Sequence, residues 1–292
     1  MNKKEPVAAE GPKNPAWRPL IGLPVGEFLA RPTPELRKLA QMAEILEIKS
    51  FPEPAWLPAK KPRVFHWGYG LVEAEFGEQF PALGPKLVDC LAFSCDLGPA
   101  ASRRQGIIPM AKILGPGELE RRIGQSLELT RKHYSGPIGA ENYNYYPTGL
   151  YERICRPDYL GRLLEKFDLF LVLDLAHAQV SAHNLKTPIR DYLSQFPLGR
   201  VAEIHLSRPY LPAQKGAWAV DAHWVPEKPQ WNLLQWVLKK IPAQGPALVV
   251  VECYHSPQVV LAAYENLKTL LDSLGLRSPN EPQRKSWPGQ AR

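Results

Sequence analysis

Residues 200–207, Arg-Val-Ala-Glu-Ile-His-Leu-Ser, combine an apolar run with two side chains that could bind a metal ion. In a strand, residues two apart point to the same side, so Glu203 and His205 would share one face near the strand's end. Apolar runs over 170–177 and 247–252 also end in an acid or a histidine. Such runs are typical of a parallel barrel whose strands bring metal ligands to one mouth.

Acids and histidines stand near the predicted strand ends along most of the chain. A lone acid at such a place is usually a solvated loop residue or a helix cap. Barrel strands converge, however, so these carboxylates would repel one another at one mouth unless cations neutralised them. Candidates on or just after strands are Glu47, His66, Asp96, Glu141, Asn142, Asp174, His177, Glu203, His205 and Glu252, and Asp221 and His223 are expected in the loop after the seventh strand.

Two properties of this set suggest which ions it would hold. Mixed imidazole and carboxylate ligation suits Fe, Mn or Zn better than Ca or Mg. The ligands also exceed what one ion can use, and carboxylates such as Glu141 and Glu252 could each bridge two ions.

The elements that would position these side chains alternate along the chain. Strands are expected over residues 20–25, 45–50, 63–67, 88–94, 137–141, 169–175, 201–206 and 247–253. Helices are expected over residues 34–44, 117–133, 157–166, 188–195, 231–240 and 257–271, whereas residues 76–87 are expected to be irregular. Eight strands with mostly helical connections predict an α/β fold, a single (β/α)8 TIM barrel.

The barrel domain is expected to span residues 20–276, between flexible tails at 1–19 and 277–292. Both tails lack hydrophobic periodicity, and together they carry +5 of the net charge of +7. No basic cluster remains in the folded body, so we expect no nucleic-acid partner.

The chain is expected to be cytoplasmic and not bound to a membrane. No apolar run approaches the roughly 20 residues that span a bilayer, and no apolar segment follows the first residues as in a secretory signal. The four cysteines show no CxxC spacing and are interpreted as reduced thiols.

Five short motifs follow one another in order: 139–143 (Gly-Ala-Glu-Asn-Tyr), 173–182, 202–206, 221–223 and 251–252. Their types and spacing resemble those of the multinuclear non-haem iron-dependent oxidative enzymes, a family that includes the oxidase that makes methanobactin. The resemblance implies a xylose-isomerase-like TIM barrel that holds two or three iron ions (Fe2+/Fe3+). It further implies an O2-using oxidoreductase that modifies cysteine-containing ribosomally synthesised peptides in natural-product biosynthesis, with a partner protein that presents the precursor peptide.

The resemblance also implies roles for individual residues. Glu141 corresponds to the bridging glutamate, and catalysis would centre on Glu141, Asp174 and His205. The implied metal ligands are His66, Asp96, Glu141, Asp174, His177, His205, Asp221, His223 and Glu252. The residues expected around them, or against the substrate, are Glu47, Asn142, Glu203 and His255.

One departure from the family's pattern lies at the end of the fourth strand. The family usually has Ser-Glu-His-Leu there, whereas residues 94–97 are Ser-Cys-Asp-Leu. Asp96 replaces the family's histidine, which leaves the occupancy or the redox potential of that iron open. Two alternatives remain. The same ligand types would serve a xylose-isomerase-like hydrolase or isomerase using Zn or Mn, and the departure at Asp96 motivates a divergent, non-catalytic metal-binding protein.

Overall fold

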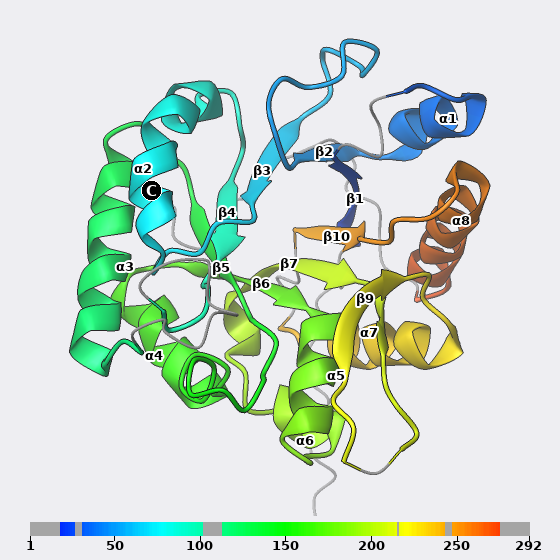
Figure 1. The fold of residues 1–292 in the computed structure, drawn as a ribbon. Coiled ribbons are helices and arrows are strands. Elements are labelled where there is room, and N and C mark those ends of the chain that lie inside the picture. The colour runs from blue at the N-terminus through cyan, green and yellow to red at the C-terminus, as the bar shows by residue number, and fades with distance from the viewer. Residues whose placement is uncertain (1–17, 27–30, 102–112, 215, 243–246, 275–292) are drawn as a thin grey trace, which may run out of the picture.

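Eight parallel strands close into a barrel, as the sequence predicts, and helices surround it (Figure 1). The computed structural model describes residues 18–26, 31–101, 113–214, 216–242 and 247–274. Neighbouring strands follow the order β1-β10-β7-β6-β5-β4-β3-β2. Their bounds are β1 (Leu20–Val25), β2 (Ile45–Ile48), β3 (Arg63–Trp67), β4 (Phe93–Asp96), β5 (Ile138–Glu141), β6 (Phe170–Asp174), β7 (Val201–Leu206) and β10 (Leu248–Val251).

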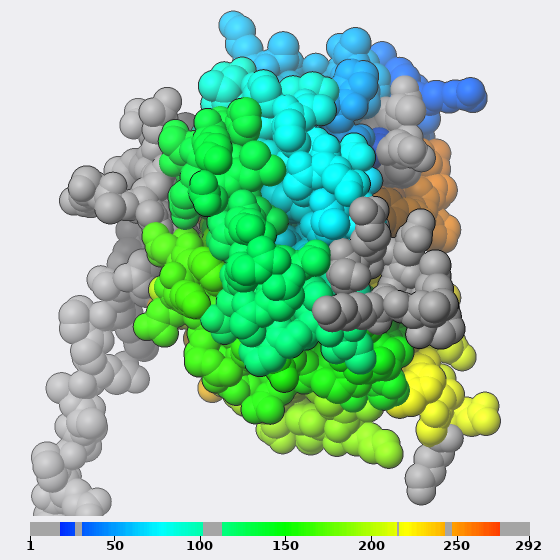
Figure 2. Space-filling model, turned by 60° about the vertical axis from the view of Figure 1, so that its left-hand side comes forward, coloured from blue at the N-terminus to red at the C-terminus, as the bar shows by residue number. Residues whose placement is uncertain are grey.

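Helices fill most connections and pack outside the barrel. In α3 (Pro116–Arg131), Leu119, Ile123 and Leu127 recur at helical spacing and are buried. Figure 2 shows the flank where α3 lies beside α2 (Ala74–Leu83), in green and cyan. No helix in the described part of the chain has the length and apolar character needed to cross a membrane. The helices besides α2 and α3 are α1 (Pro34–Met42), α4 (Pro157–Lys166), α5 (Leu175–Asn184), α6 (Ile189–Leu193), α7 (Lys228–Lys240), α8 (Pro257–Ser273) and the 3-10 turns η2 (Gly84–Leu87) and η3 (Leu198–Arg200).

The barrel interior has an apolar layer below a polar one. At Gly139, an added Cβ would lie 2.1 Å from Cε2 of Phe170, so only glycine fits beside this ring. Because strand side chains alternate, the polar layer follows two residues later, with Glu47 on β2 and His66 on β3. The apolar layer is built by Ile45, Val64, Ala92, Phe170, Val172, Ala202, Leu248 and Val250.

The prediction that residues 76–87 are irregular is wrong. They lie in α2 and η2, and Phe76 and Phe80 of α2 are buried at helical spacing. Pro81 inside α2 conceals this helix in the sequence. The fourth strand consequently begins at Phe93 instead of residue 88, and Val88 is 75% exposed.

Helix α5 was not predicted, although it begins directly after β6. Asp174 caps it, because its Oδ1 accepts a hydrogen bond of 2.6 Å from the His177 amide. Every residue of α5 except His183 is buried, so the helix has no polar face that would reveal it in the sequence.

A two-stranded antiparallel hairpin, β8 (Arg208–Tyr210) and β9 (Val220–Trp224), lies between β7 and α7. The sequence interpretation placed Asp221 and His223 in a loop; they lie on β9 instead. Side chains two apart in a strand share a face, so the hairpin presents both together. His223 has a φ of 45°, a left-handed conformation that histidine adopts more readily than most residues.

Most of both predicted tails, 1–17 and 277–292, lies outside the described residues. Arg18 is described and is only 7% exposed. Its guanidinium Nη1 donates to both carboxylate oxygens of Glu44 at 3.1 Å.

Candidate metal centre

A cavity of about 640 Å3 opens at the carboxyl ends of the barrel strands. This is the end at which active sites of TIM barrels lie. Tyr143, Asn144 and Tyr254 contribute to its wall. The predicted site residues that line it are His66, Asp96, Glu141, His177, Asp221, His223 and Glu252.

The innermost ligand group consists of Glu141, Asp174, His205 and Glu252, whose candidate ligand atoms all lie within 4.8 Å of one another. Nδ1 of His205 lies 2.8 Å from Glu141 Oε1 and 3.1 Å from Glu252 Oε2. Asp174 Oδ2 is buried and has no hydrogen-bond partner among the described residues. A buried carboxylate oxygen without a partner fits a metal ligand. The three residues predicted to be catalytic thus lie in one group.

A second group shares Glu141 with the first. Nε2 of His66 lies 3.5 Å from Glu141 Oε2 and 3.6 Å from Asp96 Oδ1. Strand register explains the proximity, because Asp96 on β4 is the direct neighbour of Glu141 on β5. The two oxygens of Glu141 therefore face different histidines, the geometry expected of a carboxylate that bridges two ions.

A third group lies nearer the hairpin. Asp221 Oδ2 lies 2.8 Å from His223 Nε2 and 3.4 Å from His177 Nε2. Its Oδ1 is buried without a hydrogen-bond partner in the part of the chain that the structure describes. His177 comes from the first turns of α5 and the other two from β9, so an additional helix and the hairpin together build this group.

Three histidines are each anchored through one ring nitrogen. Nδ1 of His66 lies 2.9 Å from the Ser94 hydroxyl. Nδ1 of His177 lies 2.8 Å from the Asn142 carbonyl, and Nδ1 of His223 lies 3.1 Å from the Glu252 carbonyl. A carbonyl can only accept, so Nδ1 of His177 and Nδ1 of His223 carry the proton. In the neutral ring of each, the free lone pair is then on Nε2. Nε2 faces the carboxylates, as in metal-binding histidines that are oriented by a second hydrogen bond.

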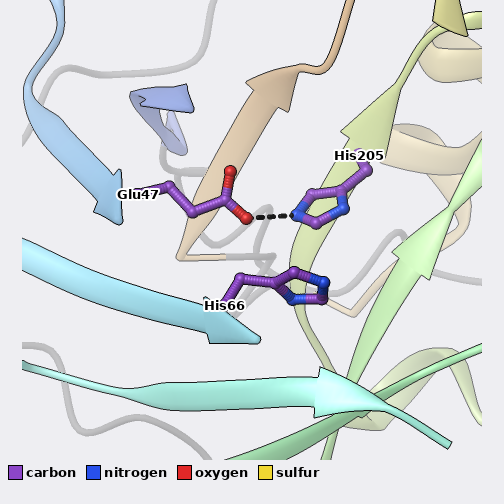
Figure 3. A group of neighbouring side chains, drawn as sticks. All are labelled: Glu47, His66 and His205. Carbon is purple, nitrogen blue, oxygen red and sulfur yellow. Dashed lines mark ion pairs between the residues drawn. The ribbon is translucent and has the colours of Figure 1, made fainter. Parts of the chain in front are cut away.

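His205 is oriented in the opposite sense. Its Nε2 lies 3.0 Å from Glu47 Oε1 (Figure 3) and 3.4 Å from Glu203 Oε1, while its Nδ1 faces the innermost group. Glu47, His66 and His205 are close enough to form a ligand group of their own. Because Glu47 contacts His205 directly, we assign Glu47 and Glu203 to orienting its ring, as carboxylates do beside metal-bound histidines.

Two further polar residues were missed by the sequence interpretation. The Lys49 ammonium lies 3.0 Å from both Glu47 Oε1 and Glu252 Oε1, and the Tyr254 hydroxyl donates to Glu252 Oε1 at 2.7 Å. Glu252 thus has only Oε2 facing the ligand group, which favours a terminal role over the bridging role that the sequence suggested. Lys49 follows Glu47 at a spacing of two, so the rule that paired Glu203 with His205 would have found it.

The buried charges of the centre need cations. Burial raises the pKa of the Glu141 and Asp174 carboxyl groups above their usual values. Burial would lower the pKa of His205, but the carboxylates of Glu47, Glu141 and Glu252 raise it well above its usual value. Lysine and histidine supply too little positive charge for this many carboxylates, so the donor set fits divalent or trivalent metal ions.

Asn142 and His255 do not join the ligand groups. Asn142 Nδ2 donates to the Asp174 carbonyl at 3.0 Å, and its Oδ1 accepts from the Asp174 amide at 2.8 Å. It therefore links the ends of β5 and β6. His255 is exposed, does not line the cavity, and accepts a hydrogen bond at Nδ1 from the Ser256 amide.

Comparison with known proteins gives a family and a fold. The family model described as RiPP precursor modification enzyme MbnB/TglH/ChrH matches residues 118–267, RiPPs being ribosomally synthesised and post-translationally modified peptides.

Among solved structures, a xylose isomerase domain protein from Planctomyces limnophilus has a TM-score of 0.57 at 14% identity and covers 88% of this chain and 98% of its own. Endonuclease IV from Thermus thermophilus has a TM-score of 0.55 at 18% identity, covering 87% of this chain and all (100%) of its own. D-Psicose 3-epimerase with D-tagatose from Clostridium cellulolyticum has a TM-score of 0.55 at 11% identity, covering 86% and 99%. At these identities the similarity shows the shared barrel fold alone.

Proposed function

Because the chain belongs to the RiPP precursor modification enzyme family MbnB/TglH/ChrH, we propose that it is an iron-dependent oxidase that modifies a cysteine-containing precursor peptide with O2. Family membership makes the protein an enzyme with a precursor peptide as its substrate. Iron, O2, the cysteine and the roles of the site residues are our proposal. A partner protein that presents the peptide remains a prediction.

The observation that carries the proposal is the position of Glu141 between two ligand groups. Its Oε1 lies 2.8 Å from His205 and its Oε2 lies 3.5 Å from His66. Glu141 would be placed to hold two ions, and mixed imidazole and carboxylate ligation suits iron. When bound, iron would supply the one-electron redox chemistry that a reaction with O2 requires.

The remaining task of the chain is to hold the substrate and exclude water. The cavity of about 640 Å3 is within the size range of small-ligand sites and can admit a cysteine side chain with neighbouring peptide atoms. Tyr143 and Tyr254 line it, and their rings would shield the bound peptide from solvent. In the proposed reaction, the peptide is oxidised at its cysteine and O2 is reduced.

The first prediction concerns metal content. Protein purified without oxygen is expected to contain more than one iron per chain, because the ligand groups exceed what a single ion can use. Elemental analysis measures the iron. Oxygen uptake and mass spectrometry with a cysteine-bearing precursor peptide measure the activity. One zinc per chain with negligible iron would contradict the proposal and favour a hydrolase or isomerase.

The second prediction concerns Asp96. A carboxylate in place of an imidazole adds negative charge beside His66 and Glu141, which stabilises the ferric state. Asp96→His is therefore expected to retain the metal and raise the reduction potential of the nearby iron by at least about 60 mV, a tenfold change in a one-electron equilibrium. A redox titration followed by Mössbauer spectroscopy measures the shift.

The matched control is Asp89→His, because Asp89 is exposed and precedes β4. It should leave the potential unchanged. Equal potentials for Asp96→His and wild type, together with unchanged iron content in Asp96→Ala, would show that Asp96 is not a ligand.

A further inference from the structure

A second cavity, of about 350 Å3, lies outside the ligand groups and is lined by three arginines and a tyrosine. The arginines are Arg153, Arg156 and Arg162, and the tyrosine is Tyr159. None of these residues belongs to the candidate metal centre.

Two of the arginines share one carboxylate, that of Asp158. Arg156 Nε lies 3.0 Å from Asp158 Oδ1, and Arg162 Nη1 lies 3.2 Å from Asp158 Oδ2. Glu152, which also lines the cavity, accepts hydrogen bonds from the amides of Gly149 and Tyr151 at 2.9 and 3.1 Å. Three arginines against the two carboxylates of Asp158 and Glu152 leave one net positive charge among the described residues, and Arg153 has no ion pair with any of them.

Two hydrogen-bond donors in this wall have no acceptor in the described part of the chain. Tyr159 is only 5% exposed, yet its hydroxyl has no hydrogen-bond partner among the described residues. The same holds for the buried Nη1 of Arg153. The guanidinium of Arg153 lies 6.0 Å from the centre of the Tyr159 ring, and both side chains line the same cavity. Buried donors without partners are costly, and a ligand that accepts from both would satisfy them.

The Tyr159 hydroxyl is suited to donate. Burial raises its pKa above the usual value, against the opposing effect of Arg153 and Arg162, so it stays protonated at neutral pH. One guanidinium charge and one neutral donor match a singly charged acceptor. A phosphate dianion would bring a second negative charge close to Glu152 and Asp158.

The segment between β5 and α4 contributes residues to both cavities. Tyr143, early in this segment, lines the metal cavity, while Arg153, later in it, lines the second cavity. Between them the rings of Tyr143 and Tyr151 stack, with centroids 5.8 Å apart and planes at 7°. An extended peptide could cross these rings and reach both cavities.

We propose that the second cavity binds a carboxylate group of the precursor peptide, held by the Arg153 guanidinium and the Tyr159 hydroxyl. The carboxylate belongs to an acidic side chain or to the peptide's C-terminus, which a volume of about 350 Å3 can enclose. The identification of the peptide as the source rests on the proposed function. The site adds a second anchor that sets which residue of the peptide reaches the metals.

The test uses iron-loaded protein without oxygen and acetylated, C-terminally amidated peptides in which a glycine spacer of increasing length separates cysteine from aspartate. A second series carries asparagine in place of aspartate. At the best spacer length, isothermal titration calorimetry is expected to show about tenfold tighter binding of the aspartate peptide, as a charged hydrogen bond provides. Arg153→Met and Tyr159→Phe should each reduce this difference to twofold or less.

Two controls keep the result specific. Arg190→Met removes an exposed arginine that also stacks on an aromatic ring, that of Trp236, and should keep the tenfold difference. Tyr159→Phe removes only a hydroxyl without a hydrogen-bond partner among the described residues, so the Tm of the free protein should not fall and a loss of affinity cannot be attributed to misfolding.

Equal affinities for the aspartate and asparagine peptides at every spacer length would overturn the proposal. So would a tenfold difference that persists in Arg153→Met or in Tyr159→Phe, or tighter binding of inorganic phosphate than of any aspartate peptide. Admission of O2 and mass spectrometry of the peptides test the oxidase separately. Selective binding without oxidation would support the carboxylate site and contradict the proposed function.

Discussion

Replacing Glu141 with alanine is expected to remove more than one metal ion per chain and to lower the rate of peptide oxidation by more than about a hundredfold. Loss of a group that merely orients a ligand costs roughly 10- to 100-fold in metal affinity or activity, and a bridging ligand should cost more. Glu141 faces His205 with one oxygen and His66 with the other, so its loss affects both groups. Elemental analysis and Mössbauer spectroscopy measure the ions that remain.

Two further variants make this result interpretable. Glu252→Ala should lose a single ion, because Lys49 and Tyr254 already occupy Glu252 Oε1 and leave only Oε2 for a metal. Glu128→Ala removes an exposed carboxylate on α3 and should lose none. If Glu141→Ala and Glu252→Ala each lost one ion, Glu141 would be a terminal ligand and the shared position would have no bridging role.

The second large effect is expected from His205→Ala. His205 is 0% exposed, and its two nitrogens lie within 3.4 Å of Glu47, Glu141, Glu203 and Glu252. Breaking a buried ion pair on one side typically costs about 3–5 kcal/mol, because the partner charge stays buried. Thermal unfolding in the presence of a chelator should therefore show a Tm lowered by more than about 6 °C.

His255→Ala is the matched control, since His255 is exposed and lines no part of the metal cavity. It should change neither Tm nor iron content. A His205→Ala variant as stable as wild type in chelator would mean that the surrounding carboxylates take up protons at little cost and that His205 is not their main counter-charge.

The hydrophobic pattern of the sequence predicted the barrel, because most of its strands are apolar runs that end in an acid or a histidine. On β7, the spacing of Glu203 and His205 placed both side chains on one face, and their atoms approach to 3.4 Å. The same pattern could not predict α5, which is buried on nearly every side and so has no amphipathic period. The hairpin was missed because its two strands are short and separated by a long connection.

The grouping of the ligands required the three-dimensional structure. Sequence order does not show that Asp96 is the neighbour of Glu141, or Asp174 the neighbour of His205; strand register determines both. Lys49 was missed because only metal-binding residue types were considered, although an ammonium can organise carboxylates as well. Residues of metal-binding types can thus be found from the sequence, whereas the residues that they lie beside are determined by the register of the barrel strands.

The hairpin gives the centre a modular construction. His66, Glu141 and His205 lie on barrel strands, and a change in those strands would disturb the hydrogen-bond ladder that closes the barrel. Asp221 and His223 lie on β9, which pairs only with β8 among the described strands and belongs to a connection between β7 and α7. Such a connection can be lengthened, shortened or replaced while the hydrogen bonds between the barrel strands stay intact. The two candidate ligands on the hairpin can therefore diversify, by evolution or by grafting, independently of the candidate ligands on the barrel strands.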